Sequence, residues 1–119
     1  MHTSRPSVEL GSFVVGEVPP PLEYQFLDAN GVAINLTGFT VVTFQWSELV
    51  QGQFVNPVTE TGTVSDALNG VVTYVWDGDE FDAPGAHAGI FYVNDGTTQY
   101  ASILITWQVC LPIGTPPAV

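Results

Sequence analysis

Apolar side chains recur at every second position of this chain, and this period constrains the fold more than any other feature. Residues 41–46 place Val42, Phe44 and Trp46 on one side of an extended backbone, and residues 71–76 do the same with Tyr74 and Trp76. Successive side chains of a β-strand point to opposite faces, whereas one face of a helix repeats every three or four residues. No segment carries a helical stripe. The pattern therefore predicts an all-β protein.

Turn sequences separate further runs of the same kind. We expect strands at residues 8–15, 22–27, 41–46, 59–65, 71–76, 88–93 and 100–111, with short extended stretches at 32–36 and 53–56 that pair at sheet edges. Three intervening turns reach Gly31, Gly70 and Gly96, which tolerate the positive φ of tight turns. Seven to nine short strands with this spacing are typical of an immunoglobulin-like antiparallel β-sandwich, and a closed small barrel is the alternative.

The length of 119 residues indicates a single domain. We expect an extended N-terminal arm at residues 1–7, a β-sandwich at 8–111 and a Pro-rich C-terminal tail at 112–119. Two facing sheets need large inward side chains, which the alternation supplies. The predicted core is Val42, Phe44, Trp46, Tyr74, Trp76, Ile90, Ile103, Ile105 and Trp107.

Charge excludes several classes of partner. The chain has 12 acidic residues against a single Arg, Arg5, and its formal net charge is −11. Binding to nucleic acid or to anionic membranes requires clustered Lys and Arg, so we expect neither. The apolar run at 103–111 is too short to span a bilayer, and the N-terminus lacks the apolar region of a signal peptide. Partners are expected to be met through apolar and backbone contacts.

Residues suited to catalysis are scarce. The histidines are His2 and His87, the chain has no Lys, and it contains neither a G-x-S-x-G turn nor a Gly-rich phosphate loop. We interpret His87 as the start of a strand rather than as a general base. Cys110 has no partner cysteine, and we expect a small buried apolar residue rather than a reactive thiol. The sequence predicts a non-enzymatic protein without a catalytic site or a cofactor.

Four acidic residues after the 71–76 strand form the best candidate for a metal site. Calcium requires several closely spaced oxygen ligands, and Asp77, Asp79, Glu80 and Asp82 supply carboxylates, although not in the EF-hand order. A solvated loop explains them better, so no metal site is predicted. The tryptophans Trp46, Trp76 and Trp107 could similarly form a sugar-binding platform, but their alternating positions favour core packing.

Two stretches resemble a known family. One runs from Gly16 through Pro19-Pro20-Pro21 and Asp28-Ala29-Asn30-Gly31 to Phe44, and the other runs from Asp66 through Asn69-Gly70 and the 71–76 strand to Pro84-Gly85 and Asp95-Gly96. Together they resemble the N-terminal immunoglobulin-like domain of bacteriophage baseplate upper proteins, a module of phage virion proteins. The resemblance covers residues 16–102.

This resemblance implies a non-enzymatic virion structural protein. The expected partners are other virion proteins, either tail and baseplate proteins or major capsid subunits that it decorates, with several copies in each particle. A carbohydrate-binding module that aids adsorption to the host surface is the alternative.

Overall fold

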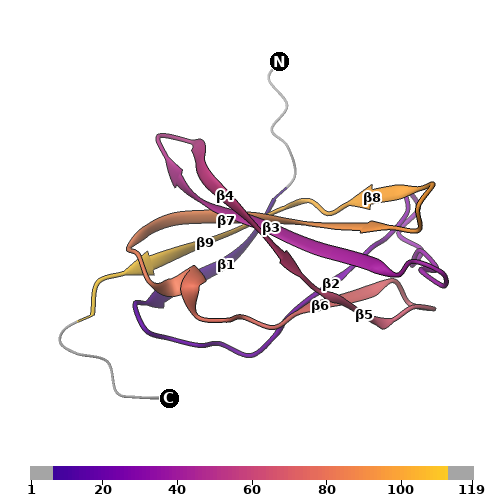
Figure 1. Ribbon diagram of the computed structural model, residues 1–119, viewed down its shortest axis with the longest axis horizontal. Coiled ribbons are helices and arrows are strands. Elements are labelled where there is room, and N and C mark those ends of the chain that lie inside the picture. Colours follow the sequence, from indigo (N-terminus) through magenta and orange to yellow (C-terminus); the bar gives the residue numbers. More distant parts are fainter. Residues whose placement is uncertain (1–6, 113–119) are drawn as a thin grey trace.

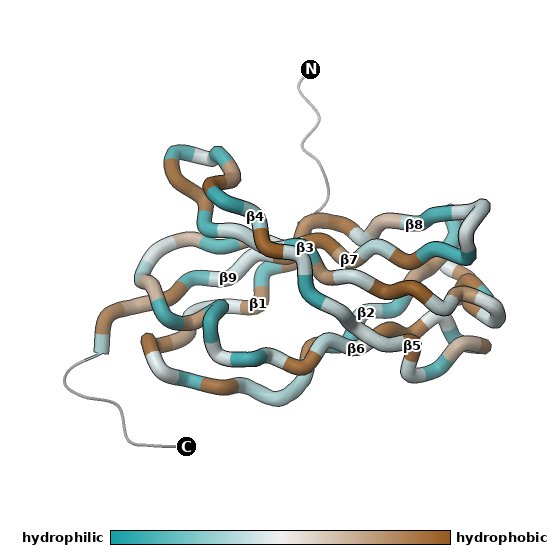
Figure 2. Tube along the Cα trace, in the orientation of Figure 1, coloured by the Kyte–Doolittle hydropathy of each residue, from teal (hydrophilic) through white to brown (hydrophobic). Residues whose placement is uncertain are grey.

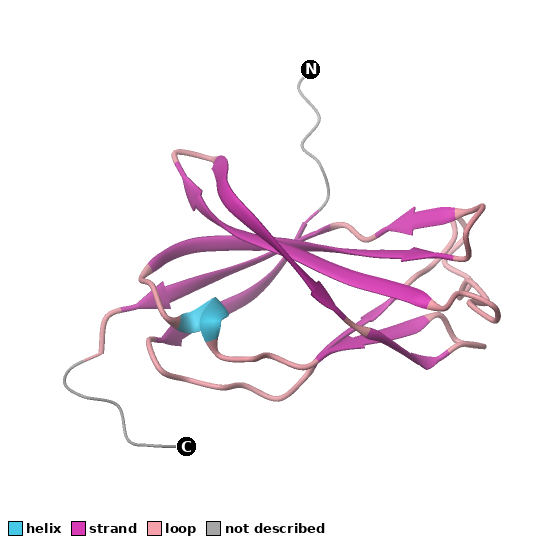
Figure 3. Ribbon diagram, in the orientation of Figure 1, coloured by secondary structure: helices cyan, strands magenta, loops and turns pink. Residues whose placement is uncertain are grey.

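The computed structural model describes residues 7–112, which fold into nine β-strands and one short 3₁₀ helix (Figures 1 and 3). Residues 1–6 and 113–119, which hold most of the predicted arm and tail, lie outside the described residues. The strands are β1 (Ser7–Val14), β2 (Leu22–Gln25), β3 (Val41–Val50), β4 (Gln53–Thr61), β5 (Thr63–Asp66), β6 (Val71–Tyr74), β7 (Gly85–Asn94), β8 (Gln99–Ala101) and β9 (Leu104–Cys110), and the helix is η1 (Asp79–Phe81). No helix in this part of the chain is long and apolar enough to cross a membrane.

The strands form two sheets with an immunoglobulin-like order. The larger sheet runs β1-β9-β7-β3-β4, with β8 paired to β7, and the smaller sheet runs β2-β6-β5. An immunoglobulin domain pairs its second, fifth and fourth strands in one sheet and its third, sixth and seventh strands in the other. Here β2, β6 and β5 correspond to the first set, and β3, β7 and β9 correspond to the second. The predicted β-sandwich is confirmed, and the strands of residues 7–112 do not close into a barrel. The pairing is antiparallel except between β1 and β9, which run parallel.

Aromatic side chains fill the space between the sheets. Phe44 on β3 is fully buried, and its ring centroid lies 4.7 Å from that of Tyr74 and 4.8 Å from that of Phe91. Trp76 and Trp107 pack edge to face, with 5.3 Å between their centroids. Seven of the nine predicted core residues are buried, but Ile90 and Ile103 are only half-buried. Ile90 points outward because its neighbours Gly89 and Phe91 occupy the inward positions of β7.

Two predicted strands are divided in the structure. The run at 59–65 passes from the larger sheet into the smaller one at Gly62, whose N–H donates to the Val42 carbonyl. The run at 100–111 breaks at the buried Ser102, whose hydroxyl accepts from the Phe91 N–H.

The two predicted short stretches have different outcomes. Residues 53–56 form the first part of β4, whereas 32–36 contributes only a single bridge between Leu27 and Ala33.

The β3–β4 hairpin projects beyond the smaller sheet (Figure 1). Its two-residue turn consists of Gln51 and Gly52, both with positive φ, as in the type I′ turns that match the twist of paired strands. Figure 2 shows hydrophobic residues in this hairpin as well as along the packed strands. Val50 and Phe54 are about half exposed there.

Candidate functional site

The loop after β6 buries one carboxyl group. Glu80 is fully buried on η1, while Asp77, Asp79 and Asp82 around it are exposed. One Glu80 oxygen accepts the Tyr74 hydroxyl, and the other accepts the Gly78 N–H at 3.0 Å. The Glu80 carbonyl accepts the Trp107 indole N–H at 3.3 Å. The prediction of a solvated loop is therefore wrong for Glu80, which joins η1 to β6 and β9.

Burial sets the protonation of this pair. Removal from water raises the pKa of Glu80 above its ordinary value, although the hydrogen bond from Tyr74 acts in the opposite direction. Burial and the neighbouring Glu80 carboxyl raise the pKa of Tyr74, so its hydroxyl remains a donor. A neighbouring carboxylate, Asp77, raises the pKa of the exposed Asp79. Among the described residues, no group of three or more His, Cys, Asp or Glu side chains is arranged to hold a metal ion.

His87 lies in the core near the start of β7. Its ring stacks on Trp107 with 5.7 Å between the centroids, and its Nδ1 lies 3.1 Å from the Gly85 carbonyl oxygen. Because a carbonyl only accepts, Nδ1 carries the proton. Nε2 lies 4.0 Å from a carboxylate oxygen of Glu48. His87 is thus a packed core residue of the strand, close to the position predicted for it.

The remaining candidates, the three tryptophans and Cys110, differ in their burial. Trp46, Trp76 and Trp107 are buried in the core, so they do not form an exposed sugar platform. Cys110 is exposed, which corrects the prediction of a buried residue. Its neighbour Val109 takes the inward position at the end of β9, and alternation turns Cys110 outward.

The outward side of the larger sheet is unusual for so acidic a chain. Thr43 pairs with Tyr92, and Gln45 pairs with Ile90, on the side away from Phe44 and Phe91. On β3, β4 and β7 this side carries no charged residue. Glu48 and Glu60 lie in register with the inward residues His87 and Phe44, on the opposite side.

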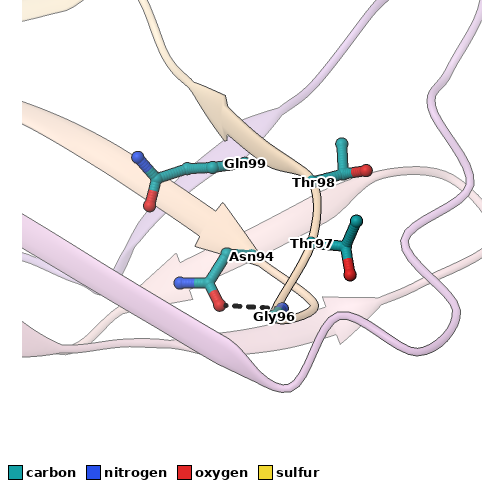
Figure 4. A pocket seen from close by; sticks show the side chains of 5 residues that line it. All are labelled: Asn94, Gly96, Thr97, Thr98 and Gln99. Carbon is teal, nitrogen blue, oxygen red and sulfur yellow. Dashed lines mark hydrogen bonds between the residues drawn. The ribbon is translucent and has the colours of Figure 1, made fainter.

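Three adjoining hollows follow this outward side, and we call them together the outer-face groove. The first, of about 260 Å³, lies at the β7–β8 hairpin (Figure 4) and is lined by Asn94, Gly96, Thr97, Thr98 and Gln99. The second, of about 220 Å³, is lined by Thr43, Gln45, Thr59, Tyr92 and Gln99. The third, of about 250 Å³, is lined by Gln45, Trp46, Ser47, Phe54, Pro57, Ile90 and Tyr92. Gln99 lines the first and second hollows, and Gln45 and Tyr92 line the second and third, so the three hollows adjoin.

The chemistry of the groove changes along its length. At the hairpin end, Asn94 accepts the Gly96 N–H at 3.2 Å, which shapes the polar turn drawn in Figure 4. At the other end, Phe54 and Pro57 from β4 face Ile90 and Tyr92 from β7 across Gln45 and Ser47. The Ser47 hydroxyl both accepts the Val55 N–H at 2.9 Å and donates to the Val55 carbonyl at 2.6 Å, which fixes the bulged part of β4. Such a surface suits uncharged, extended ligands.

Sequence reasoning missed this groove. The alternation that marks Phe44 as inward also marks Gln45 as outward, and this was the available signal. The bulge that brings Phe54 and Pro57 beside Ile90 depends on three-dimensional pairing. No family model matches the chain, and a search of curated proteins finds no matching sequence.

Proposed function

We propose that this protein is a non-enzymatic structural protein of a bacteriophage virion, docked on the tail or baseplate or decorating the capsid. The proposal rests on the sequence resemblance over residues 16–102, and the immunoglobulin-like order of the strands is compatible with it. The observation that carries it in the structure is the uncharged outward side of β3, β4 and β7.

Charge explains why this side is suited to assembly. The chain carries a net charge of −11, and copies brought together through acidic faces would repel one another. The outer-face groove offers amide, hydroxyl, aromatic and aliphatic groups without that repulsion. Contacts with other virion proteins would form there, while the exposed acidic side chains elsewhere remain in water.

Antibody labelling of intact particles tests the proposal. Antibodies raised against the recombinant protein should label purified virions in electron micrographs, at the tail end or over the capsid shell. The position of the label decides between the two locations. Particles that remain unlabelled while the lysate contains the free protein would refute the virion assignment.

The carbohydrate-binding alternative loses its expected platform, because the three tryptophans lie in the core. A glycan would have to use Tyr92 with Gln45 and Thr43 on the outward side. Binding of the purified protein to host-surface polysaccharide, abolished by Tyr92→Thr, would favour that function instead.

A further inference from the structure

We propose that residues 79–84, which we call the η1 flap, open away from the end of the core when Glu80 ionises. The fold would then carry a pH-sensitive flap that is closed while Glu80 is protonated and opens as the pH rises. The inference goes beyond the proposed function and does not depend on it, because it concerns a conformational change within the protein itself. It rests on what the flap covers, on the absence of Lys and Arg from residues 7–112 and on the glycines that flank the segment.

The η1 flap covers aromatic side chains at one end of the sandwich. In Figure 3, η1 lies at the end where β1 and β9 finish. The centroid of the fully buried Phe81 ring lies 5.0 Å from that of Trp76 and 6.4 Å from that of Trp107. On the β1 side, the Phe13 ring packs edge to face on Phe81, with 5.0 Å between the centroids. Opening of the flap would therefore admit water to the aromatic end of the core.

Glu80 is a buried carboxyl group without a positive charge to neutralise it. Its side chain is fully buried, and residues 7–112 contain neither Lys nor Arg. The Tyr74 hydroxyl and the Gly78 N–H donate to its oxygens, but removal of a carboxylate from water costs more than such bonds return. Burial accordingly raises the pKa of Glu80. The closed flap favours the protonated carboxyl, whereas an open flap returns the carboxylate to water.

The surrounding titratable groups do not supply the missing charge. Those next to Glu80, or next to the residues that it or the flap contacts, are Tyr74 on β6, Asp77 before η1, Asp79 and Asp82 on the flap, Glu60 on β4, Glu17 after β1 and His87 on β7. All except His87 are neutral or negative, and Asp77 further raises the pKa of Glu80 by repulsion. His87 stacks on Trp107, and its Nε2 lies 4.0 Å from a carboxylate oxygen of Glu48.

The flanking glycines and the few bonds to the flap allow it to move as a unit. Gly78 has φ +105° and Gly85 has φ +125°, and an added Cβ would meet no atom within 4 Å at either position. Glycine adopts such backbone angles without strain, so both ends can act as hinges. The Trp107 indole N–H donates to the Glu80 carbonyl at 3.3 Å, and the Gly16 N–H donates to the Phe81 carbonyl at 3.3 Å. Both bonds are longer than usual, so opening of the flap requires less free energy than unfolding of the whole domain.

Hydrogen exchange followed by NMR at a series of pH values from 4 to 8 tests the proposal on the full-length protein. The reporters are the Trp107 indole N–H and the Gly78 N–H, which both donate to Glu80. After correction for the intrinsic exchange rates, their protection should fall by up to about tenfold for each pH unit above 4.5, until the pKa of Glu80 in the closed state is reached. Their protection should also be lower than that of the Phe91 N–H, which is bonded to Ser102 within the core.

Three variants assign the response to Glu80. Glu80→Gln cannot ionise, so protection of the Trp107 indole N–H should not change with pH. Asp82→Asn, exposed on the same flap, is the matched control and should keep the wild-type dependence. Tyr74→Phe removes a donor to the carboxylate, so the fall in protection should continue to a higher pH, and this variant replaces Glu80→Gln if the latter fails to fold.

Four results would overturn the proposal. They are wild-type protection that stays constant from pH 4 to 8, a wild-type dependence in Glu80→Gln, loss of the dependence in Asp82→Asn, and a fall in Tyr74→Phe that ends at the same pH as in the wild type or below it. Equal protection of the Trp107 indole N–H and the Phe91 N–H would also overturn it, because the flap would then open only when the whole domain unfolds.

Discussion

At the scale of single residues, the aromatic core encloses a carboxyl group. The buried Glu80 accepts hydrogen bonds from Tyr74 on β6, from the Gly78 N–H just before η1 and, at its carbonyl, from Trp107 on β9. Alternation correctly predicts that Tyr74 and Trp107, in β6 and β9, are inward, and Trp76 is also buried although β6 ends at Tyr74, before the end of the predicted 71–76 strand. Alternation does not predict the burial of Glu80, since that depends on how the loop after β6 folds back onto Tyr74 and onto Trp107, 27 residues away. Ile103 was predicted wrongly for a related reason, because it lies in the break between β8 and β9 where alternation stops.

Truncation of a core tryptophan should be costly. We expect Trp76→Ala to lower the free energy of unfolding by about 3–5 kcal/mol, because it leaves a cavity next to Phe44, Phe81 and Trp107. The neighbouring Val75 is 68% exposed, so Val75→Ala should change the free energy of unfolding by only about 0.5 kcal/mol. Urea denaturation of the three proteins measures both differences. Equal losses for the two variants would contradict the described core.

The buried carboxyl should make stability depend on pH in a specific direction. Because the pKa of Glu80 is raised in the folded protein, the native state holds this proton more tightly than the unfolded chain does. Its stabilising contribution is therefore complete below the ordinary value of 4.5 and is lost as the pH rises through the raised pKa. The free energy of unfolding of Glu80→Gln, relative to wild type, should increase as the pH rises from 4 to 8.

Urea denaturation at several pH values, with the exposed Glu23→Gln as a control for loss of one negative charge, checks this dependence. A relative stability of Glu80→Gln that falls toward high pH would show that the carboxylate form is the one the fold prefers.

At the scale of elements, turns and bulges decide how the predicted strands are used. The Asn69-Gly70 turn is recognisable in the sequence, and in the structure the Gly70 carbonyl accepts the Phe26 N–H at 2.8 Å. Gly62 is a weaker signal, and only the three-dimensional pairing shows that the chain changes sheets there. The bulge of Asn56 and Pro57 opposite Ser47 shapes the outer-face groove; Pro57 marks an edge strand or a bulge in the sequence, but the residue that the bulge faces follows only from the pairing. Strand identity is thus largely predictable here, whereas the groove depends on irregularities.

Gly70 offers a test at this scale. It has φ +70°, and an added Cβ would lie 2.6 Å from the Ile34 carbonyl oxygen and 2.8 Å from that of Phe26. Gly96 also has a positive φ, +94°, but no atom lies within 4 Å of the added Cβ. We expect Gly96→Ala to cost about 1–2 kcal/mol through backbone strain alone, and Gly70→Ala to cost clearly more. Thermal unfolding followed by circular dichroism compares them, and a smaller loss for Gly70→Ala would contradict this loop packing.

At the scale of the whole molecule, the acidic loop and the outer-face groove lie on different parts of the sandwich. The acidic loop of Asp77, Asp79 and Asp82 lies at the η1 end of the sandwich, whereas the outer-face groove carries no charged residue. The immunoglobulin-like sandwich predicted from the strands is confirmed. The virion setting is our proposal, and it rests on the sequence resemblance over residues 16–102.

Removal of the C-terminal residues 112–119 should impair assembly into virions without impairing folding. Residues 112–119 follow the last strand, so a chain that lacks them should keep a circular dichroism spectrum and a melting temperature close to those of the full chain. The same deletion should reduce incorporation into virions when the variant replaces the wild type in the phage. If virions incorporated the truncated chain in the same amount as the wild type, residues 112–119 would have no part in docking.

The content of purified particles tests the central claim most directly. Quantitative mass spectrometry of gradient-purified virions, with the major capsid protein as internal reference, measures the number of copies in each particle. We predict several copies of this protein per virion, retained through repeated banding of the particles. Its absence from the particles, with the protein present in the soluble fraction of the same lysate, would contradict a structural role in the virion.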